Sequence, residues 1–286
     1  MSLKIIQERF DEYHCASRQE EEQALREITQ EVALAALSRA GFFKLAGFQG
    51  GTALRILYSL QRFSEDLDFL LRVPRSDFGW EPYLKHMIVE LSAYGFAVQV
   101  ADRSKAADPV QKAFLKEQSI GKILRLRYPL TTGRPKQIQI KFELDTNPPQ
   151  GSRFETKYLD FPFPFPVTVQ DLASLFAGKS HALLCREYLK GRDWYDFVWY
   201  AGRKPTVNYD FLAAALHQQG PWQGTRPQVT KEWYLDAMRK KIIGTDWNEA
   251  KNDVARFLKP NELRTLELWS AEFFLDRLAK IAETLP

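Results

Sequence analysis

A glycine-rich turn followed closely by two acids on one strand constrains this chain more than any other feature of its sequence. Segment 48–55 reads FQGGTALR, and segment 62–69 reads RFSEDLDF. Gly50 and Gly51 allow a sharp turn that leaves backbone amides open to an anion, and the helix expected over 52–60 directs its positive end at the same place. The two segments therefore predict a phosphate-binding turn, a short helix and then a strand.

Asp66 and Asp68 are the first candidates for chemistry. They are two residues apart on a strand expected over 64–71, so both side chains project from one face. Neighbouring carboxylates repel each other unless a cation lies between them, and Mg²⁺ prefers oxygen ligands. An arbitrary pair of this kind usually faces solvent or caps a loop. Here the preceding turn, with its Thr52 hydroxyl, favours a metal-dependent nucleotide site.

A later strand carries a third acid on its polar face. Apolar and polar residues alternate through segment 137–145, which is typical of a half-buried strand. Glu143 could lie beside the two aspartates and complete a set of metal-binding carboxylates. The alternatives are a solvent-exposed face, or an ion pair between Glu143 and Lys141 on the same face.

Lys179 lies within the apolar stripe of its own predicted helix, which it shares with Leu172, Leu175, Phe176 and Leu183. Lysine seldom points inward without a reason. We interpret Lys179 as a point charge that holds a triphosphate. The alternative is that its aliphatic stem packs along the stripe while its ammonium reaches solvent.

Two more acids follow in segment 192–197, which reads RDWYDF. Asp193 and Asp196 are three residues apart and share one face of a predicted helix. Asp193 could simply cap that helix. Asp196 has aromatic neighbours in the sequence and therefore requires a cationic partner, such as Lys179 or Arg192.

The order of the predicted elements indicates an α+β fold with two domains. Helices and strands alternate in the N-terminal half, which predicts a mixed sheet with helices on one side. The expected helices cover 17–40, 52–60 and 80–94, and the expected strands cover 64–71, 96–101, 122–129 and 137–144.

Prolines then interrupt this order. NPPQG at 147–151 breaks it, and FPFPFP at 161–166 predicts a stiff extended connector. The chain after residue 168 is almost wholly helical in pattern. We therefore place the boundary within 147–167, with a catalytic domain over 1–155 and a helical domain over 156–286.

The overall composition excludes several classes of protein. The two cysteines form no CxxC motif, so we expect neither a disulfide scaffold nor a structural zinc site. We expect the protein in a reducing cytoplasm. We find no secretion signal and no apolar run long enough to cross a membrane. The net charge of +4 neither requires nor excludes nucleic acid, because a local basic surface can exist within a balanced total.

Basic residues do gather in two stretches, the second of them rich in aromatic residues. They are Arg125, Arg127, Arg134 and Lys136, then Lys231, Arg239, Lys240 and Lys241 near Trp222, Trp233 and Tyr234. Such a surface can hold RNA through phosphate contacts and stacking. Each residue taken singly is explained as well by a solvated helix face.

With these residues in view, the chain resembles the AbiEii/AbiGii nucleotidyltransferase toxin family, a branch of the DNA polymerase β-like nucleotidyltransferase superfamily. The motifs that match are GGTALR, RFSEDLDF, Glu143 in IKFEL, Lys179 in LFAGK, and RDWYDF. They span residues 48–197, and the chain after about residue 205 carries none. The resemblance implies a toxin of a toxin–antitoxin or phage-defence system, which transfers a nucleotide from an NTP to RNA, in some relatives to the 3′ end of tRNA.

The resemblance also implies roles for individual residues. Those that contact the nucleotide would be Gly50, Gly51, Thr52, Arg55, Ser64 and Lys179. The catalytic residues would be Asp66, Asp68, Glu143, Lys179 and Asp196. Asp66, Asp68 and Glu143 would hold two magnesium ions, and Asp193 competes with Asp196 for the role of the last acid.

The expected partners are an NTP, tRNA or another RNA, and an antitoxin from a neighbouring gene; no membrane is expected. The helical domain would complete the site and bind the acceptor. Two other hypotheses remain open. The acceptor could be a protein or a small molecule, or the chain could be a non-catalytic nucleotide-binding regulator. Paired metal ligands argue against the regulator, since a pure binder has little use for them.

Overall fold

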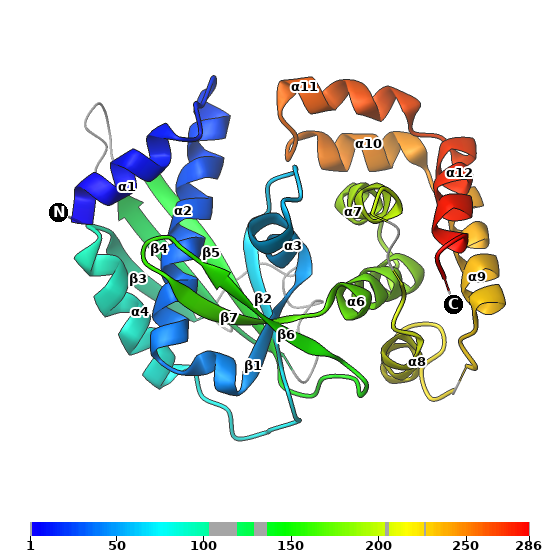
Figure 1. The fold of residues 1–286 in the computed structure, drawn as a ribbon, viewed down its shortest axis with the longest axis horizontal. Helices are drawn as coiled ribbons and strands as arrows, with labels where there is room; N and C mark the ends of the chain where they lie inside the picture. Colours follow the sequence, from blue (N-terminus) through cyan, green and yellow to red (C-terminus); the bar gives the residue numbers. More distant parts are fainter. Residues whose placement is uncertain (1, 103–118, 129–135, 204–205, 226, 286) are drawn as a thin grey trace. The chain divides into compact units, whose positions relative to one another are not determined.

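The computed structural model describes residues 2–102, 119–128, 136–203, 206–225 and 227–285 (Figure 1). The chain forms two compact units. The first unit comprises Met1–Ser59, Phe63–Pro148 and Glu155–Val169, and the second comprises Leu60–Arg62, Pro149–Phe154 and Gln170–Pro286. The first unit thus includes part of the proline-rich segment that we expected to connect two domains.

The first unit is built on a mixed sheet with the strand order β3-β4-β5-β2-β1-β7-β6. The strands are β1 (Ala46–Gln49), β2 (Asp66–Leu71), β3 (Ala97–Asp102), β4 (Ser119–Tyr128), β5 (Lys136–Asp145), β6 (Phe154–Leu159) and β7 (Phe165–Gln170). Pairs β1–β2, β3–β4 and β4–β5 are antiparallel, whereas β2–β5 and β1–β7 are parallel. The predicted α+β fold with a mixed sheet is therefore confirmed.

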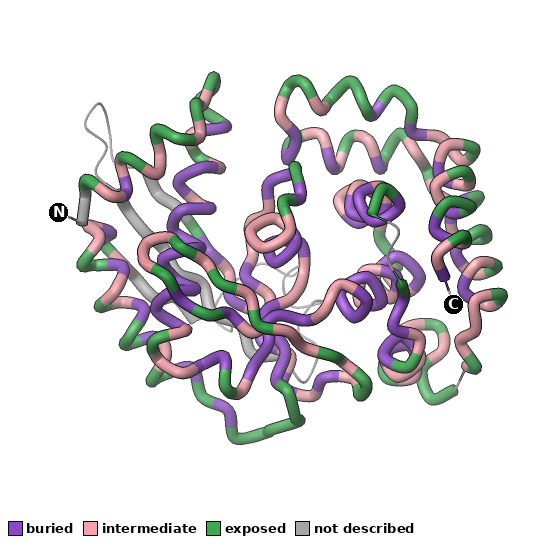
Figure 2. Tube along the Cα trace, in the orientation of Figure 1, coloured by how far each residue is buried: buried purple, intermediate pink, exposed green. Residues whose placement is uncertain are grey.

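The helices of the first unit are α1 (Ser2–Asp11), α2 (Arg18–Arg39), the short 3₁₀ helix η1 (Phe42–Lys44), α3 (Gly50–Tyr58) and α4 (Glu81–Ala93). Helix α2 begins where Ser17 accepts a hydrogen bond from the backbone N–H of Glu20, as an N-cap residue should. It packs against β5 and α4 and is buried through most of its length (Figure 2). The core of this unit therefore lies between α2 and the sheet.

One face of β2 belongs to this core. Leu67 and Phe69 are buried, and the ring of Phe69 meets that of Phe42 edge to face at 5.0 Å. Asp66 and Asp68 alternate with them and are only half-buried. The period of two along a strand thus turns both carboxylates away from the apolar face.

The second unit is helical, as predicted for the C-terminal part. Its helices are α6 (Leu172–Cys185), α7 (Gly191–Ala201), α8 (Tyr209–Gln218), α9 (Lys231–Ile243), α10 (Trp247–Ala255), α11 (Pro260–Leu263), η3 (Arg264–Leu268) and α12 (Ala271–Ala282). Helix α6 packs against α7, α8 and α9. The ring of Phe176 on α6 stacks on that of Tyr200 on α7 at 4.3 Å, which places α7 at the centre of this core.

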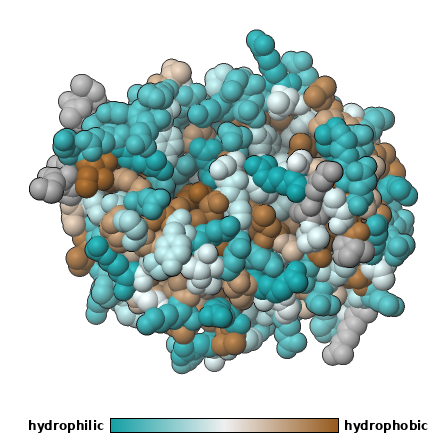
Figure 3. Space-filling model, viewed as in Figure 1, coloured by the Kyte–Doolittle hydropathy of each residue, from teal (hydrophilic) through white to brown (hydrophobic). Residues whose placement is uncertain are grey.

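Hydrophilic side chains cover much of the face seen in Figure 3, with apolar patches between them. Within the described ranges, no helix combines the length and apolar character needed to cross a membrane.

Candidate active site

The glycine turn leads from β1 directly into α3. This helix begins at Gly50, two residues before the start that we predicted. Gly50 has a φ of +80°, a conformation that residues with a side chain rarely adopt. A Cβ atom at this position would lie 2.5 Å from Oδ2 of Asp68. The turn and the second carboxylate of β2 are therefore in close contact, and the glycine is needed for both its conformation and its small size.

We predict that Gly50→Ala lowers the free energy of unfolding by about 1–3 kcal/mol, because a residue forced into this region of φ is strained. Gly79→Ala is the matched control, since a Cβ atom there would meet nothing within 4 Å. Chemical denaturation of both variants measures the difference. Equal stabilities for the two variants would contradict the close contact at Gly50.

Thr52 fixes α3 to the beginning of β2. It is fully buried, and its hydroxyl donates a hydrogen bond to the backbone carbonyl oxygen of Asp66. The Gln49 side chain makes a similar tie, donating to the carbonyl oxygen of Phe69 over 3.2 Å. The bond from Thr52 holds the carboxylate-bearing strand against the turn, and the expected contact of its hydroxyl with the nucleotide stays a prediction.

The strand register brings three of the predicted acids to one face of the sheet. In the parallel β2–β5 pair, Asp68 lies opposite Glu143 and Asp66 lies opposite Lys141. On the other side of β2, Gln49 lies opposite Asp68. Paired residues point to the same side, so Glu143 shares the face of both aspartates. Lys141 shares that face too, so the alternative that it forms an ion pair with one of these acids still stands.

These three carboxylates fit the donor chemistry of a magnesium site, because Mg²⁺ takes oxygen ligands from one or two carboxylates together with substrate phosphates. Their spacing is not that of a closed protein cage: within the described part of the chain, no group of three or more His, Cys, Asp or Glu residues is arranged to hold a metal ion.

Arg55 and Ser64 both contact the long helix α2. Arg55 Nε donates to Glu27 Oε2 over 2.8 Å, and its guanidinium lies 4.5 Å from the centroid of the Phe63 ring. Gln30 of α2 donates to the carbonyl oxygen of Ser64 over 3.2 Å. The bond to Glu27 joins α3 to α2, and the expected contact of Arg55 with the nucleotide stays a prediction.

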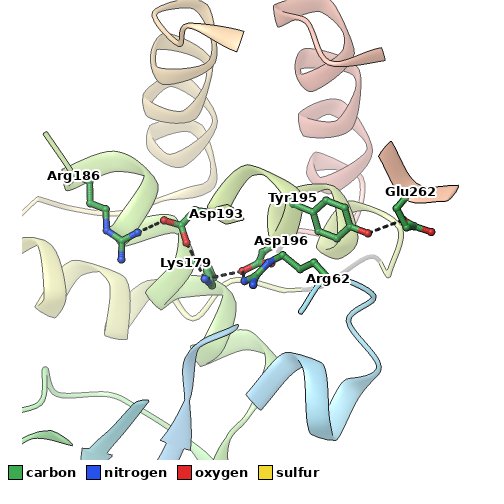
Figure 4. A network of polar contacts seen from close by, with 7 residues as sticks. All are labelled: Arg62, Lys179, Arg186, Asp193, Tyr195, Asp196 and Glu262. Carbon is green, nitrogen blue, oxygen red and sulfur yellow. Dashed lines mark hydrogen bonds and ion pairs between the residues drawn. The ribbon is translucent and has the colours of Figure 1, made fainter. Parts of the chain in front are cut away.

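A compact ionic network in the second unit joins Lys179 of α6 to both acids of α7 (Figure 4). Lys179 Nζ lies 2.8 Å from Asp193 Oδ1 and 2.7 Å from Asp196 Oδ2. Arg62 Nε and Nη2 donate to the two oxygens of Asp196 over 2.6 and 2.7 Å. Arg186 Nη1 donates to Asp193 Oδ2.

Arg62 and the two acids are shielded from water, whereas the Arg186 side chain at the edge of the network is 32% exposed. The side chains of Asp196 and Arg62 are 0% and 2% exposed. Burial alone would raise the pKa of Asp193, but the charges of Lys179 and Arg186 outweigh it and hold that pKa well below the usual range. The Asp193 carboxylate is therefore ionised, and Asp193 and Asp196 each contact two cationic side chains. Two-point Arg–carboxylate contacts of this kind are strong and directional.

These contacts answer three expectations about the second unit. Lys179 is a partner of Asp196, as predicted, and its ammonium is paired inside the unit rather than extended to solvent. The second partner of Asp196 is Arg62, not Arg192, whose guanidinium lies 4.2 Å from the centroid of the Phe257 ring. Arg62 is the first residue of the RFSEDLDF motif. Its place in that motif was the only sign in the sequence that Arg62 is important.

The proposed basic and aromatic surface is only partly formed by the residues named for it. Tyr234 lies in the core, fully buried and hydrogen-bonded to Ser180 at 3.0 Å, so it cannot stack on a base. Arg239 and Lys240 are exposed, and Trp222 packs edge to face on Trp233. Of the first basic group, Arg134 and the side chains of Arg125, Arg127 and Lys136 lie outside the described residues.

Comparisons with known proteins agree with this fold. Two solved structures from Helicobacter pylori share the fold. One is a protein proposed to be a nucleotidyltransferase, with 15% identity, a TM-score of 0.50, and coverage of 90% of this chain and 92% of that one. The other is JHP933, with 14% identity, a TM-score of 0.50, and coverage of 94% and 92%. Among curated proteins, none matches this chain.

The family model described as nucleotidyl transferase AbiEii toxin, type IV toxin–antitoxin system, matches residues 32–277. That match includes both segments of the glycine turn and β2, the acid on β5, and the network of α6 and α7. This chain belongs to the AbiEii nucleotidyltransferase toxin family.

Proposed function

We propose that this nucleotidyltransferase uses magnesium to transfer a nucleoside monophosphate from an NTP to the 3′ hydroxyl of an RNA, specifically a tRNA. The observation that carries the proposal is the arrangement at Gly50. A turn that offers backbone amides lies directly against Asp68, and Asp68 lies opposite Glu143. An anion-binding turn beside clustered carboxylates suits a substrate that arrives as a metal–triphosphate complex.

Asp66, Asp68 and Glu143 would hold the magnesium ions. When bound, such ions neutralise charge on the phosphates and lower the pKa of the attacking hydroxyl. The amides that follow Gly50 would hold the triphosphate, and Ser64 would lie beside it. Glu143 would either accept the proton of the acceptor hydroxyl or serve as a further oxygen ligand of magnesium.

The transfer of the nucleoside monophosphate needs no reactant besides the NTP and the RNA. The 3′ oxygen forms a bond to the α-phosphorus of the NTP, the bond from that phosphorus to the bridging oxygen breaks, and pyrophosphate leaves. Lys179 would donate a hydrogen bond to a phosphate oxygen as negative charge grows on it. An ammonium has three N–H groups, and two of those of Lys179 point to Asp193 and Asp196.

The second unit is the part of the chain that we propose for acceptor binding. Exposed Arg239 and Lys240 on α9, and the half-buried Trp222–Trp233 pair of which Trp233 lies on the same helix, support an RNA acceptor. Membership of a type IV toxin–antitoxin family implies an antitoxin partner and a nucleotide substrate. NTPs and tRNA are found together in the cytoplasm, where we propose that the protein acts.

Incubation of the purified chain with Mg²⁺, each α-labelled NTP in turn and total tRNA tests the function. We expect label on the tRNA with one or more NTPs, and none when a chelator is added. Label on the protein or on a small molecule would keep the chemistry and replace the acceptor. NTP binding without pyrophosphate release would support the non-catalytic regulator instead.

A further inference from the structure

The loop between α6 and α7 places an exposed aromatic ring between two cations. The loop comprises residues 186–190, which read REYLK. Tyr188 is 38% exposed. Arg186 Cζ and Lys190 Nζ each lie 5.7 Å from the centroid of its ring. An accessible ring flanked by positive charges combines the two means by which proteins hold a single nucleic acid strand, base stacking and phosphate contact.

This loop is held at both of its ends. At its start, Arg186 donates to the buried carboxylate of Asp193, and Lys241 Nζ donates to the Arg186 carbonyl oxygen over 3.4 Å. At its end, α7 begins so close to α10 that a Cβ atom at Gly191 would overlap the carbonyl group of Ala250. A surface fixed in this way loses little conformational entropy when a ligand binds to it.

The loop carries one net positive charge, because it holds Arg186 and Lys190 against the exposed Glu187. Burial and then the neighbouring charge of Arg186 lower the pKa of the Lys190 ammonium to about 8. Arg192 and Lys179 repel Lys190 as well, whereas Asp193 attracts it. The buried carboxylates are already bound by Lys179 and Arg186, so an added anion would meet a net positive potential.

We propose that this loop binds a single-stranded segment of the acceptor RNA, with one base stacked on Tyr188 and the adjoining phosphodiester held by Lys190 and Arg186. The inference rests on the proposed function, because it names where the acceptor of that reaction is held. A ring face accepts any base, so binding at this loop is expected to tolerate changes of sequence. The NTP is the other source of phosphate, and binding measured without any NTP separates the two.

The test compares two double variants of the full chain, each of which removes one exposed tyrosine and one lysine. Tyr188→Ala/Lys190→Gln alters the loop, and Lys157→Gln/Tyr158→Ala on β6 is the matched control. Arg186 is left in place because it binds the buried Asp193. Fluorescence anisotropy with a short labelled oligoribonucleotide, without any NTP, measures the dissociation constant at several salt concentrations.

We expect the loop variant to raise the dissociation constant for the oligoribonucleotide roughly tenfold or more, as removal of one stacking ring does. The salt dependence should become shallower by about 0.7 in the log–log slope, because the variant neutralises one phosphate fewer. The control variant should bind as the original chain does, and the KM for the NTP should be unchanged in both.

Three results would overturn the inference. They are unchanged RNA binding by the loop variant, equally weakened binding by the control variant, or a raised KM for the NTP with RNA binding intact, which would assign the loop to the triphosphate. Failure of the proposed function looks different. In that case the original chain would bind the oligoribonucleotide through this loop but transfer no nucleotide to any RNA.

Discussion

Asp66→Asn is expected to abolish nucleotidyl transfer while leaving the first unit folded. The amide keeps the shape of the side chain but removes the charge that would hold magnesium. Metal stabilisation of a phosphoryl-transfer transition state amounts to several kcal/mol, and each 1.4 kcal/mol is tenfold in rate, so we expect a loss of at least about 10³-fold in kcat/KM. Transfer of labelled nucleotide to tRNA over a range of enzyme concentrations measures it.

The stability of the same variant separates catalysis from folding. Asp66 and Asp68 share a face, so removal of one charge relieves repulsion between them and should leave the melting temperature equal or higher. Added Mg²⁺ with an NTP should stabilise the original chain and fail to stabilise the variant. Asp77→Asn, at an exposed aspartate of the same unit, is the matched control. Full activity of Asp66→Asn would show that Asp66 is not a ligand of the magnesium ion.

The elements that the sequence predicts well are those whose pattern is local. Helix α2 and strand β5 each carry a clear apolar period along their own length, and the predicted bounds of both agree with the structure to within a residue or two. Strands β1, β6 and β7 were not predicted. Strand β1 has only four residues, and β7 carries Pro166 among the buried Phe165, Val167 and Val169, so the prolines concealed the alternation of β7.

The candidate site divides in the same way. The spacing of Asp66 and Asp68 is enough to put them on one face, because the period of a strand is two. That Glu143 lies opposite Asp68 follows from the parallel register of two strands far apart in sequence, which no local pattern encodes. The pairing of Arg62 with Asp196 joins residues 134 positions apart, and sequence periodicity says nothing about such a contact.

Asp196→Ala is expected to destabilise the second unit strongly. It would leave the guanidinium of Arg62, which is 2% exposed, without the carboxylate to which its Nε and Nη2 donate. Loss of one partner of a buried pair costs about 3–5 kcal/mol, against a total stability of about 5–15 kcal/mol. Asp236→Ala on α9 removes a carboxylate paired with Lys240 at the surface and should cost less than about 1 kcal/mol. Urea denaturation of both variants gives the comparison.

A third variant decides whether Asp196 acts only by holding Arg62. Replacement of both partners, as Arg62→Leu/Asp196→Leu, removes the buried guanidinium together with its carboxylate, and well-packed apolar residues often restore the stability of a buried pair or exceed it. We expect this double variant to be more stable than Asp196→Ala, with Lys179 still bound by Asp193. If it also recovers transfer activity, Asp196 is a positioning residue and Asp193 becomes the remaining candidate for the last acid of the motif. If stability returns and activity does not, the network itself takes part in the reaction, through Asp196 or through the second carboxylate that it provides for Lys179.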